Sequence, residues 1–268
     1  MAAPTRVQVT PHAQALATTT VSMTFSSPPT VGNAIVVAFI YYALGGNTTT
    51  CADNRGNTYS SSGANTSGNI GVKIFHCSNV TTSGTPFIVT ITANTATYFE
   101  ASAIEVGSTG GNLVVDKTTG SGSGTTTIGT GSTAALTNAD VFIVSGFSVT
   151  SNQSSITVES VSPSWTQEFE QLSYSTSVAG EIDSRSRTGV SGTTQSCSWT
   201  VTTGAPDTSL IVVFAPTVTT EARISQYSVE ILSQPVPAIN ITQYSVEILS
   251  ATVATVVTES TQFMIVMP

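Results

Sequence analysis

The feature of this sequence that most constrains its fold is the return of short apolar segments separated by turn residues. Segments rich in Val, Ile, Thr and Phe recur roughly every 10 to 15 residues, with Gly, Pro, Asn and Ser between them. No stretch predicts a helix of more than two turns. The spacing predicts an all-β fold, an antiparallel, jelly-roll-like β-sandwich. The expected strands are 7–10, 20–25, 34–42, 70–77, 87–93, 98–106, 113–117, 141–149, 156–161, 165–172, 178–185, 196–202 and 210–215.

The expected strands follow two patterns. Residues 196–202 alternate, with Cys197, Trp199 and Val201 on one face and polar residues on the other, which is typical of a strand between core and solvent. The runs IVVAFI (35–40) and LIVVF (210–214) are apolar at consecutive positions. We expect these two to be central strands that are covered on both faces, by the protein's own core or by a neighbouring subunit.

Composition excludes several classes of partner. Charged residues make up 8% and hydrophobic residues 40% of the chain, whereas a typical domain is about one-quarter charged. Thr, Ser, Asn and Gly must therefore cover most of the surface. With a net charge of -8 and no basic cluster, the chain is not expected to bind nucleic acid. No apolar run approaches the ~20 residues that span a bilayer, and no signal-peptide pattern opens the sequence, so no membrane partner is expected.

The segment DNRGNTY (53–59) resembles a calcium loop in its spacing of Asp and Asn. However, Ser62 stands where such a loop carries a bidentate Glu. Turn chemistry explains the segment without a metal, because Asp53 and Asn57 can bond to nearby backbone and Gly56 can take a positive φ. His12 and His76 have no partner at ligand spacing. We expect no metal and no cofactor.

Four carboxylates could serve acid–base cleavage of a polysaccharide, which needs two acids facing one cleft. Glu168 and Glu170 would share a face of one strand, and Glu181 and Asp183 a face of another. The second face continues with Arg185 and Arg187. A charged outer face with pairing across strands explains this alternation more simply. The sequence therefore predicts a protein that is not an enzyme.

Trp165 follows the turn-like SPS segment and is the ring that we expect to be most exposed. It is interpreted as a structural ring at the sandwich rim, with contact to a ligand as the alternative. Cys51, Cys77 and Cys197 are too few for a disulfide framework. They are expected to be buried thiols in a reducing cytosol, with a Cys51–Cys77 bridge as the alternative.

The chain is expected to divide into a body, residues 1–216, and a C-terminal arm, residues 217–268. Pro216 ends the last apolar strand, and the repeats follow it. Inside the body, the Gly/Ser/Thr-rich segment 118–133 is interpreted as a surface loop or a pair of edge strands. A linker that divides the body there is the alternative.

The arm contains one short segment twice, ISQYSVEILS at 224–233 and ITQYSVEILS at 241–250. Each copy alternates as a half-buried strand does, and Pro235 and Pro237 stiffen the connector. We expect these strands to pair with the same arm of sister subunits, with a trimer favoured, or to dock on a host particle. Folding back onto the body as a hairpin is the alternative. The expected interface residues are Tyr227, Val229, Ile231, Tyr244, Val246 and Ile248, with Gln226 and Gln243 on the other face and Phe263 in a looser third copy.

A resemblance follows from CADNRGNTYS (51–60), SCSWTVTTGAPDTSLIVVFAP (196–216) and the repeat ARISQYSVEIL. Their layout resembles that of β-sandwich structural proteins of tailed bacteriophages, and the repeat is similar to those at the ends of phage virion proteins. The resemblance implies a virion protein assembled in the host cytoplasm, most simply a decoration or cement protein that contacts the major capsid protein. The alternatives are a tail-fibre or receptor-binding component that meets host-surface carbohydrate, and a secreted carbohydrate-binding module.

Overall fold

The structure, a computed structural model, describes residues 3–42, 48–107, 112–173 and 178–217. Every regular element in these ranges is a β-strand, and every strand pair is antiparallel. None of the described residues forms a helix able to cross a membrane. The prediction of an all-β, antiparallel sandwich is confirmed. The repeat arm, with all its expected interface residues, lies outside the described residues, so its pairing stays a prediction.

The first seven strands form one sheet that folds over itself. The main layer has the order β1-β7-β3-β6-β5, and β2 and β4 also pair with β7. The 20-residue β7 serves both layers, because its first half pairs with β2 and β4 and its second half with β3. Apolar side chains of both layers enclose a core that includes Met23, Phe39 and Phe87. The strands are β1 (Thr5–Val9), β2 (Ala13–Thr24), β3 (Ala34–Tyr42), β4 (Thr49–Asp53), β5 (Ser60–Ser67), β6 (Ile70–Cys77) and β7 (Ile88–Gly107).

The remaining eight strands form a second sandwich from two separate sheets. One sheet has the order β12-β13-β10-β15-β8 and the other β11-β14-β9. Phe147, Trp165 and Trp199 belong to the core between them. The strands are β8 (Leu113–Ser121), β9 (Thr127–Gly129), β10 (Val141–Val149), β11 (Ile156–Val158), β12 (Thr166–Gln171), β13 (Ala179–Arg187), β14 (Ser198–Val201) and β15 (Asp207–Pro216).

The two sandwiches have the same topology. The order β5-β6-β3-β7-β1 corresponds to β12-β13-β10-β15-β8, and β4-β7-β2 corresponds to β11-β14-β9. Detailed features repeat as well: the amide of Val80 donates to Asn33 O (2.7 Å), and the amide of Val190 donates to Ala139 O (2.9 Å), each three residues after the β6 or β13 strand. We call residues 3–107 the N-terminal sandwich and residues 112–217 the C-terminal sandwich. The chain thus contains one strand arrangement twice, which the sequence analysis did not detect.

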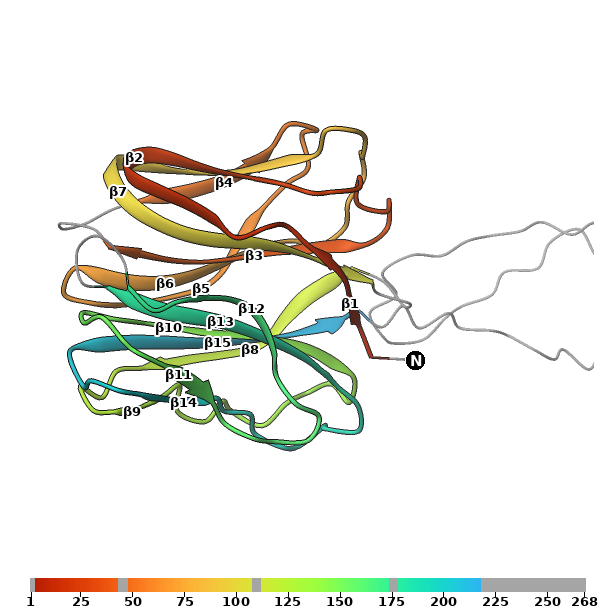
Figure 1. The fold of residues 1–268 in the computed structure, drawn as a ribbon. Coiled ribbons are helices and arrows are strands. Elements are labelled where there is room, and N and C mark those ends of the chain that lie inside the picture. Colours follow the sequence, from red (N-terminus) through yellow and green to blue (C-terminus); the bar gives the residue numbers. More distant parts are fainter. Residues whose placement is uncertain (1–2, 43–47, 108–111, 174–177, 218–268) are drawn as a thin grey trace, which may run out of the picture. The chain divides into compact units, whose positions relative to one another are not determined.

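The two sandwiches pack through their larger sheets, so the strands lie in layers (Figure 1). In Figure 1, β2 and β4 lie above β3, β6 and β5, and β10, β13 and β15 lie between these and β11, β14 and β9. Strands β3 and β15 are therefore covered on both faces, as their uninterrupted apolar sequences predicted. The interface core includes Val36, Ala38, Ile40, Val72, Ile74, Phe142, Val144, Ile182, Leu210, Val212 and Phe214.

Several strands differ from the prediction. The two strands expected at 87–93 and 98–106 are one continuous strand, β7. Strands β4 and β5 were not predicted, because β5 consists mainly of Ser, Gly, Asn and Thr and the five-residue β4 (TTCAD) contains no large apolar residue. Residues 118–133 supply the end of β8 and all of β9, which are edge strands of the two sheets of the C-terminal sandwich. Along the chain, the boundary between the two sandwiches lies between β7 and β8 and not within residues 118–133.

Candidate functional site

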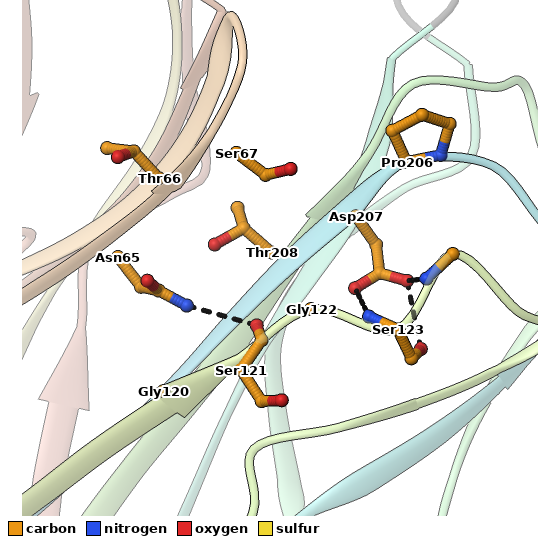
Figure 2. Close-up of a pocket in the computed structure, with 11 residues that line it drawn as sticks. Asn65, Thr66, Ser67, Gly120, Ser121, Gly122, Ser123, Pro206, Asp207 and Thr208 are labelled. Atoms are coloured by element: carbon orange, nitrogen blue, oxygen red, sulfur yellow. Dashed lines mark hydrogen bonds between the residues drawn. The ribbon is translucent and has the colours of Figure 1, made fainter.

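One polar pocket lies where the edges of the two sandwiches meet (Figure 2). It has a volume of about 350 Å³. The end of β5 supplies Asn65, Thr66 and Ser67, and the rest come from the end of β8 with the loop after it and from the start of β15 with the proline before it. The pocket is therefore formed by both sandwiches, and its lining is almost entirely neutral and polar.

The polar groups of this pocket mainly bond to each other. Asp207 accepts hydrogen bonds from the amides of Ser123 (2.8 Å) and Gly124 (2.7 Å) and from the Ser123 hydroxyl (3.0 Å). Asn65 Nδ2 donates to Ser121 O (3.0 Å) and Ser209 O (2.9 Å), which ties β5 to the C-terminal sandwich. Because Asp207 is only 2% exposed and bonded at both oxygens, its role is to hold the loop after β8. This pocket presents hydroxyl and amide groups to a ligand, but its lining contains no pair of an acid and a base.

The acidic and basic residues of β13 do not form a charged outer face, and that prediction is wrong. Glu181, Asp183 and Arg185 are buried, with exposures of 1%, 0% and 6%. The strand lies second from the edge of its sheet, between β12 and β10. One of its faces packs on the N-terminal sandwich through Ile182, so the alternating charges must point into the C-terminal sandwich.

The buried carboxyl groups of Glu181 and Asp183 form a pair on this face. Asp183 accepts a hydrogen bond from Trp199 Nε1 at 2.7 Å. Burial raises the pKa of Glu181, and the nearby Asp183 and Glu170 charges raise that pKa further. Burial likewise raises the pKa of Asp183, against the lowering effect of the Trp199 bond. The pair therefore favours holding a proton, and at 1% and 0% exposure it lies out of reach of a polysaccharide.

Glu168 and Glu170 do not share a face, contrary to the prediction. A β-bulge between Gln167 and Phe169 interrupts the pairing of β12 with β13. Glu168 consequently bonds to Arg6 of the N-terminal sandwich at 3.0 Å and accepts a bond from Ser184. Glu170 lies opposite Glu181. Glu168 thus lies at the interface, Glu181 and Asp183 lie in the C-terminal core, and Glu170 is only half-buried.

Trp165 is buried at 8% exposure, so the expectation of an exposed ring is wrong. The ring belongs to the core of the C-terminal sandwich, and the Arg185 guanidinium covers it with its carbon 4.0 Å from the ring centroid. Trp165 Nε1 donates to Glu159 Oε1 at 3.3 Å. The ring is therefore not available to stack against a ligand, although its indole nitrogen bonds to a residue of a neighbouring pocket.

That second pocket has a volume of about 360 Å³ and contains both arginines of β13. Its lining residues are Glu159, Val161, Ser162, Arg185, Arg187, Thr194, Gln195 and Ser196. Sequence reasoning did not single it out. The signal that could have found it is the spacing of Arg185 and Arg187, two alternating arginines in a chain with a combined Lys and Arg count of 7.

The turn interpretation of DNRGNTY is confirmed. Asp53 Oδ1 accepts bonds from the amides of Arg55 (2.8 Å) and Asn57 (3.1 Å), and Gly56 has a φ of 81°. Asp53 Oδ2 accepts bonds from Asn57 Nδ2 (2.9 Å) and from the Tyr59 hydroxyl (3.0 Å). The carboxylate is thus fully used by its own turn. Nowhere in the described ranges do three or more His, Cys, Asp or Glu residues gather as a metal site.

The histidines and cysteines have structural surroundings. His12 forms an ion-pair contact with Glu100 and stacks on Phe169, and the Nδ1 of His76 bonds to the Ser62 hydroxyl at 2.8 Å. All three cysteines are free thiols, so the Cys51–Cys77 bridge is not present. Cys51 and Cys77 belong to the two layers of the N-terminal sandwich rather than to neighbouring strands. Burial raises the pKa of both thiols and makes them poor nucleophiles.

The class of protein that this geometry defines is a double antiparallel β-sandwich in which one topology occurs twice. Comparisons with protein-family models, with curated proteins and with solved structures give no match. Proposals for function therefore depend on the residues and their arrangement.

Proposed function

We propose that this chain is a non-enzymatic structural protein of a bacteriophage virion, a decoration or cement protein of the capsid exterior that self-associates through its C-terminal arm. The observation that carries the proposal is the near-identity of residues 224–233 and 241–250, which differ only at Ser225 and Thr242. Both copies follow the end of the compact unit at Thr217. Two alternating strands of this kind form only a marginal sheet alone, so another surface must bury their apolar faces, and the same arm of sister subunits supplies one.

The body supports a structural role. Its acid pair, Glu181 and Asp183, is enclosed by the C-terminal sandwich, and Glu168 is engaged with Arg6 and Ser184. Only 8% of the chain is charged, so the surface is mainly hydroxyl and amide groups. A surface of this kind suits a protein that packs closely among copies of itself and the major capsid protein, because few charges have to be desolvated.

The experiment compares the full chain with two double variants of the arm. Val229→Asp with Val246→Asp places charges on the expected apolar face, and Ser228→Asp with Ser245→Asp places the same charges on the opposite face. We expect the full chain and the serine variant to form trimers by light scattering after gel filtration, and the valine variant to be a monomer. A valine variant that stays trimeric would contradict the proposed role of the arm.

The place in the virion is tested separately by quantitative mass spectrometry of purified particles. A copy number close to that of the major capsid protein is the expected result for a decoration protein. A copy number of the order of the tail proteins would overturn that assignment in favour of a tail-fibre or receptor-binding component. Absence from particles would overturn the virion proposal and favour a secreted carbohydrate-binding module.

A further inference from the structure

Two arginines in an acidic chain point into one pocket. The net charge is -8, yet Arg185 and Arg187 both line the second pocket, whose volume is about 360 Å³. They lie two residues apart on β13, so their side chains leave the strand on the same face. Arg185 Nη2 and Arg187 Nη1 both donate to Gln195 Oε1, at 3.3 and 2.9 Å. One neutral oxygen thus holds two like charges, an arrangement that an anion would stabilise.

No carboxylate among the described residues forms an ion pair with these two arginines. Arg185 is 6% exposed, and its Nε has no hydrogen-bond partner there. Among the described residues, ion pairs within 4.0 Å involve Arg6, His12 and Lys117, and neither Arg185 nor Arg187. Burial and the neighbouring Arg187 charge lower the pKa of Arg185, and the smaller raising effects of Cys197 and Glu159 do not offset them. A buried cation without its counter-charge is costly, so the pocket favours an anionic partner.

The nearest carboxylates are occupied by tryptophans. Glu159 lines the pocket, but its oxygens accept bonds from Trp165 Nε1 (3.3 Å) and the Ser198 hydroxyl (3.1 Å). Asp183, on the same face of β13, accepts the bond of Trp199 Nε1. Both acids thus accept an indole hydrogen bond, and neither forms an ion pair with the arginines.

The guanidinium groups are also held in place. The Trp165 ring lies under Arg185, and the Gln195 amide is fixed because its Nε2 donates to Thr193 Oγ1 (3.1 Å) and Thr194 O (2.8 Å). A planar fork fixed in this way matches the geometry of a carboxylate, and little side-chain freedom is lost on binding. The site is thus formed before the ligand arrives.

We propose that this pocket binds the carboxylate of an acidic sugar. Arg185 and Arg187 receive the carboxylate, and the hydroxyls of Ser162, Thr194 and Ser196 and the oxygens of Glu159 face the sugar hydroxyls. A volume of about 360 Å³ lies at the lower end of small-molecule sites and suits a single sugar unit rather than a long chain. The proposal does not depend on the arm or on the virion role.

The test is a titration of the full chain with glucuronate and with glucose, which differ only at C6, a carboxylate in glucuronate and a hydroxymethyl group in glucose. The readout is the pair of indole N–H signals in a nitrogen-correlated NMR spectrum, because the chain has 2 Trp residues. We expect glucuronate to shift the Trp165 signal in a saturable way, since Trp165 bonds to Glu159 in the pocket. The Trp199 signal, whose partner is buried Asp183, should move less, and glucose should move neither.

Matched variants then locate the binding. We expect Arg187→Gln to weaken glucuronate binding by about tenfold or more, because the carboxylate loses one of its two guanidinium partners. Arg55→Gln removes the same charge from a turn of the N-terminal sandwich and should leave binding unchanged. Equal weakening by both variants, or no glucuronate binding by the wild-type chain, would overturn the site. If Arg187→Gln does not fold, Arg187→Lys keeps the charge without the planar fork and should also weaken binding.

Competition with inorganic sulfate distinguishes a site for an acidic sugar from a site for any small anion. We expect sulfate to compete only at concentrations about tenfold above those of glucuronate, because it leaves the hydroxyls of the pocket unused. If sulfate competes as well as glucuronate and depends on Arg187 in the same way, the proposed specificity for a sugar is wrong and the pocket is a simple anion site. None of these results depends on whether the arm forms trimers.

Discussion

At Glu181 and Asp183 the protein keeps two carboxyl groups side by side in its core. Both positions carry acids although the core around them is apolar and contains the packed rings of Phe147 and Trp199. The Trp199 indole bonds to one oxygen of Asp183, while Glu181 Oε2 and Asp183 Oδ1 have no hydrogen-bond partner among the described residues. Holding a proton between the two groups lowers the cost of burying them.

This pair predicts that the protein loses stability as the pH rises. Both pKa values are raised in the folded state, so above about pH 4 the unfolded chain releases protons that the folded chain keeps. The stabilising contribution is full at acid pH and is lost as the pH rises through the folded pKa values. Glu181→Gln removes one titrating group, and we expect it to stabilise the fold by on the order of 1 to 3 kcal/mol at pH 8.

The measurement is the urea unfolding free energy of wild type and Glu181→Gln from pH 3 to pH 8. We expect the unfolding free energy of Glu181→Gln to fall less with rising pH than that of wild type. Asp116→Asn is the contrast, because bonds from Asn138, Lys117 and Thr137 outweigh burial and lower the pKa of Asp116. That variant should lose stability mainly at neutral pH and little at acid pH. Glu181→Gln destabilising the protein at pH 8 would show that the carboxylate is held charged.

Single residues were predictable from sequence only where their chemistry is local. The Asp53 turn was predicted because Asp, Asn and Gly bond within a few residues of each other. The environment of β13 was not, because Glu181, Asp183, Arg185 and Arg187 alternate as residues on a solvated strand do. Only the position of β13 between two other strands, with a sandwich on one side and a sheet on the other, buries the first three and leaves Arg187 half-buried.

At the scale of elements, the approach of β13 to the N-terminal sandwich depends on Gly180. A Cβ at this position would lie 2.3 Å from Phe147 O and 2.6 Å from Ile40 Cδ1 of the facing sheet. The carbonyl belongs to the paired strand β10 and cannot move without breaking the ladder. This glycine therefore sets how closely the two sandwiches pack.

We expect Gly180→Ala to destabilise the protein by about 1 to 3 kcal/mol, because the added methyl overpacks the interface and displaces backbone. Gly129→Ala is the control: its Cβ would meet only Cys197 O at 3.9 Å, an ordinary contact. Urea unfolding of both variants checks the prediction. Equal stability of Gly180→Ala and Gly129→Ala would mean that β13 shifts without cost.

Strand prediction succeeded where apolar side chains mark the strand. Strands β3, β6 and β10 have the predicted bounds, because both of their faces are largely buried and their sequences are correspondingly apolar. Strands β4, β5 and β9 lie at sheet edges, and ladder bonds rather than apolar packing define them. The pocket between β5 and β8 was unpredictable for the same reason.

At the scale of the whole described body, two sandwiches of one topology share an interface that neither can complete alone. Val36, Ile40 and Ile74 face Phe142, Leu210 and Phe214 across it. Each apolar side chain buried there stabilises the pairing by roughly 1.5 to 3 kcal/mol relative to exposure. Polar contacts close both borders: Arg6 bonds to Glu168 at 3.0 Å on one, and Asn65 bonds to Ser209 O at 2.9 Å on the other.

This interface predicts that the sandwiches stay together when the chain between them is cut. A protease site inserted between Gly107 and Asn112 should give, after cleavage, two fragments that elute together in gel filtration and unfold in one transition. The apolar contacts do not require covalent continuity, and separation would expose Val36, Ile40 and Phe142 to water. The same cleaved protein with Ile40→Asp should separate, because the charge would be buried against the facing sheet without a partner.

The control is Thr66→Asp, which places a charge at an exposed position near the end of β5 rather than in the core. Cleaved protein with this change should remain one complex. Fragments that separate in the wild-type sequence would mean that the linkage, and not the apolar interface, keeps the sandwiches together. In that case each sandwich would have to be stable with its larger sheet exposed, which the continuous apolar sequences of β3 and β15 argue against.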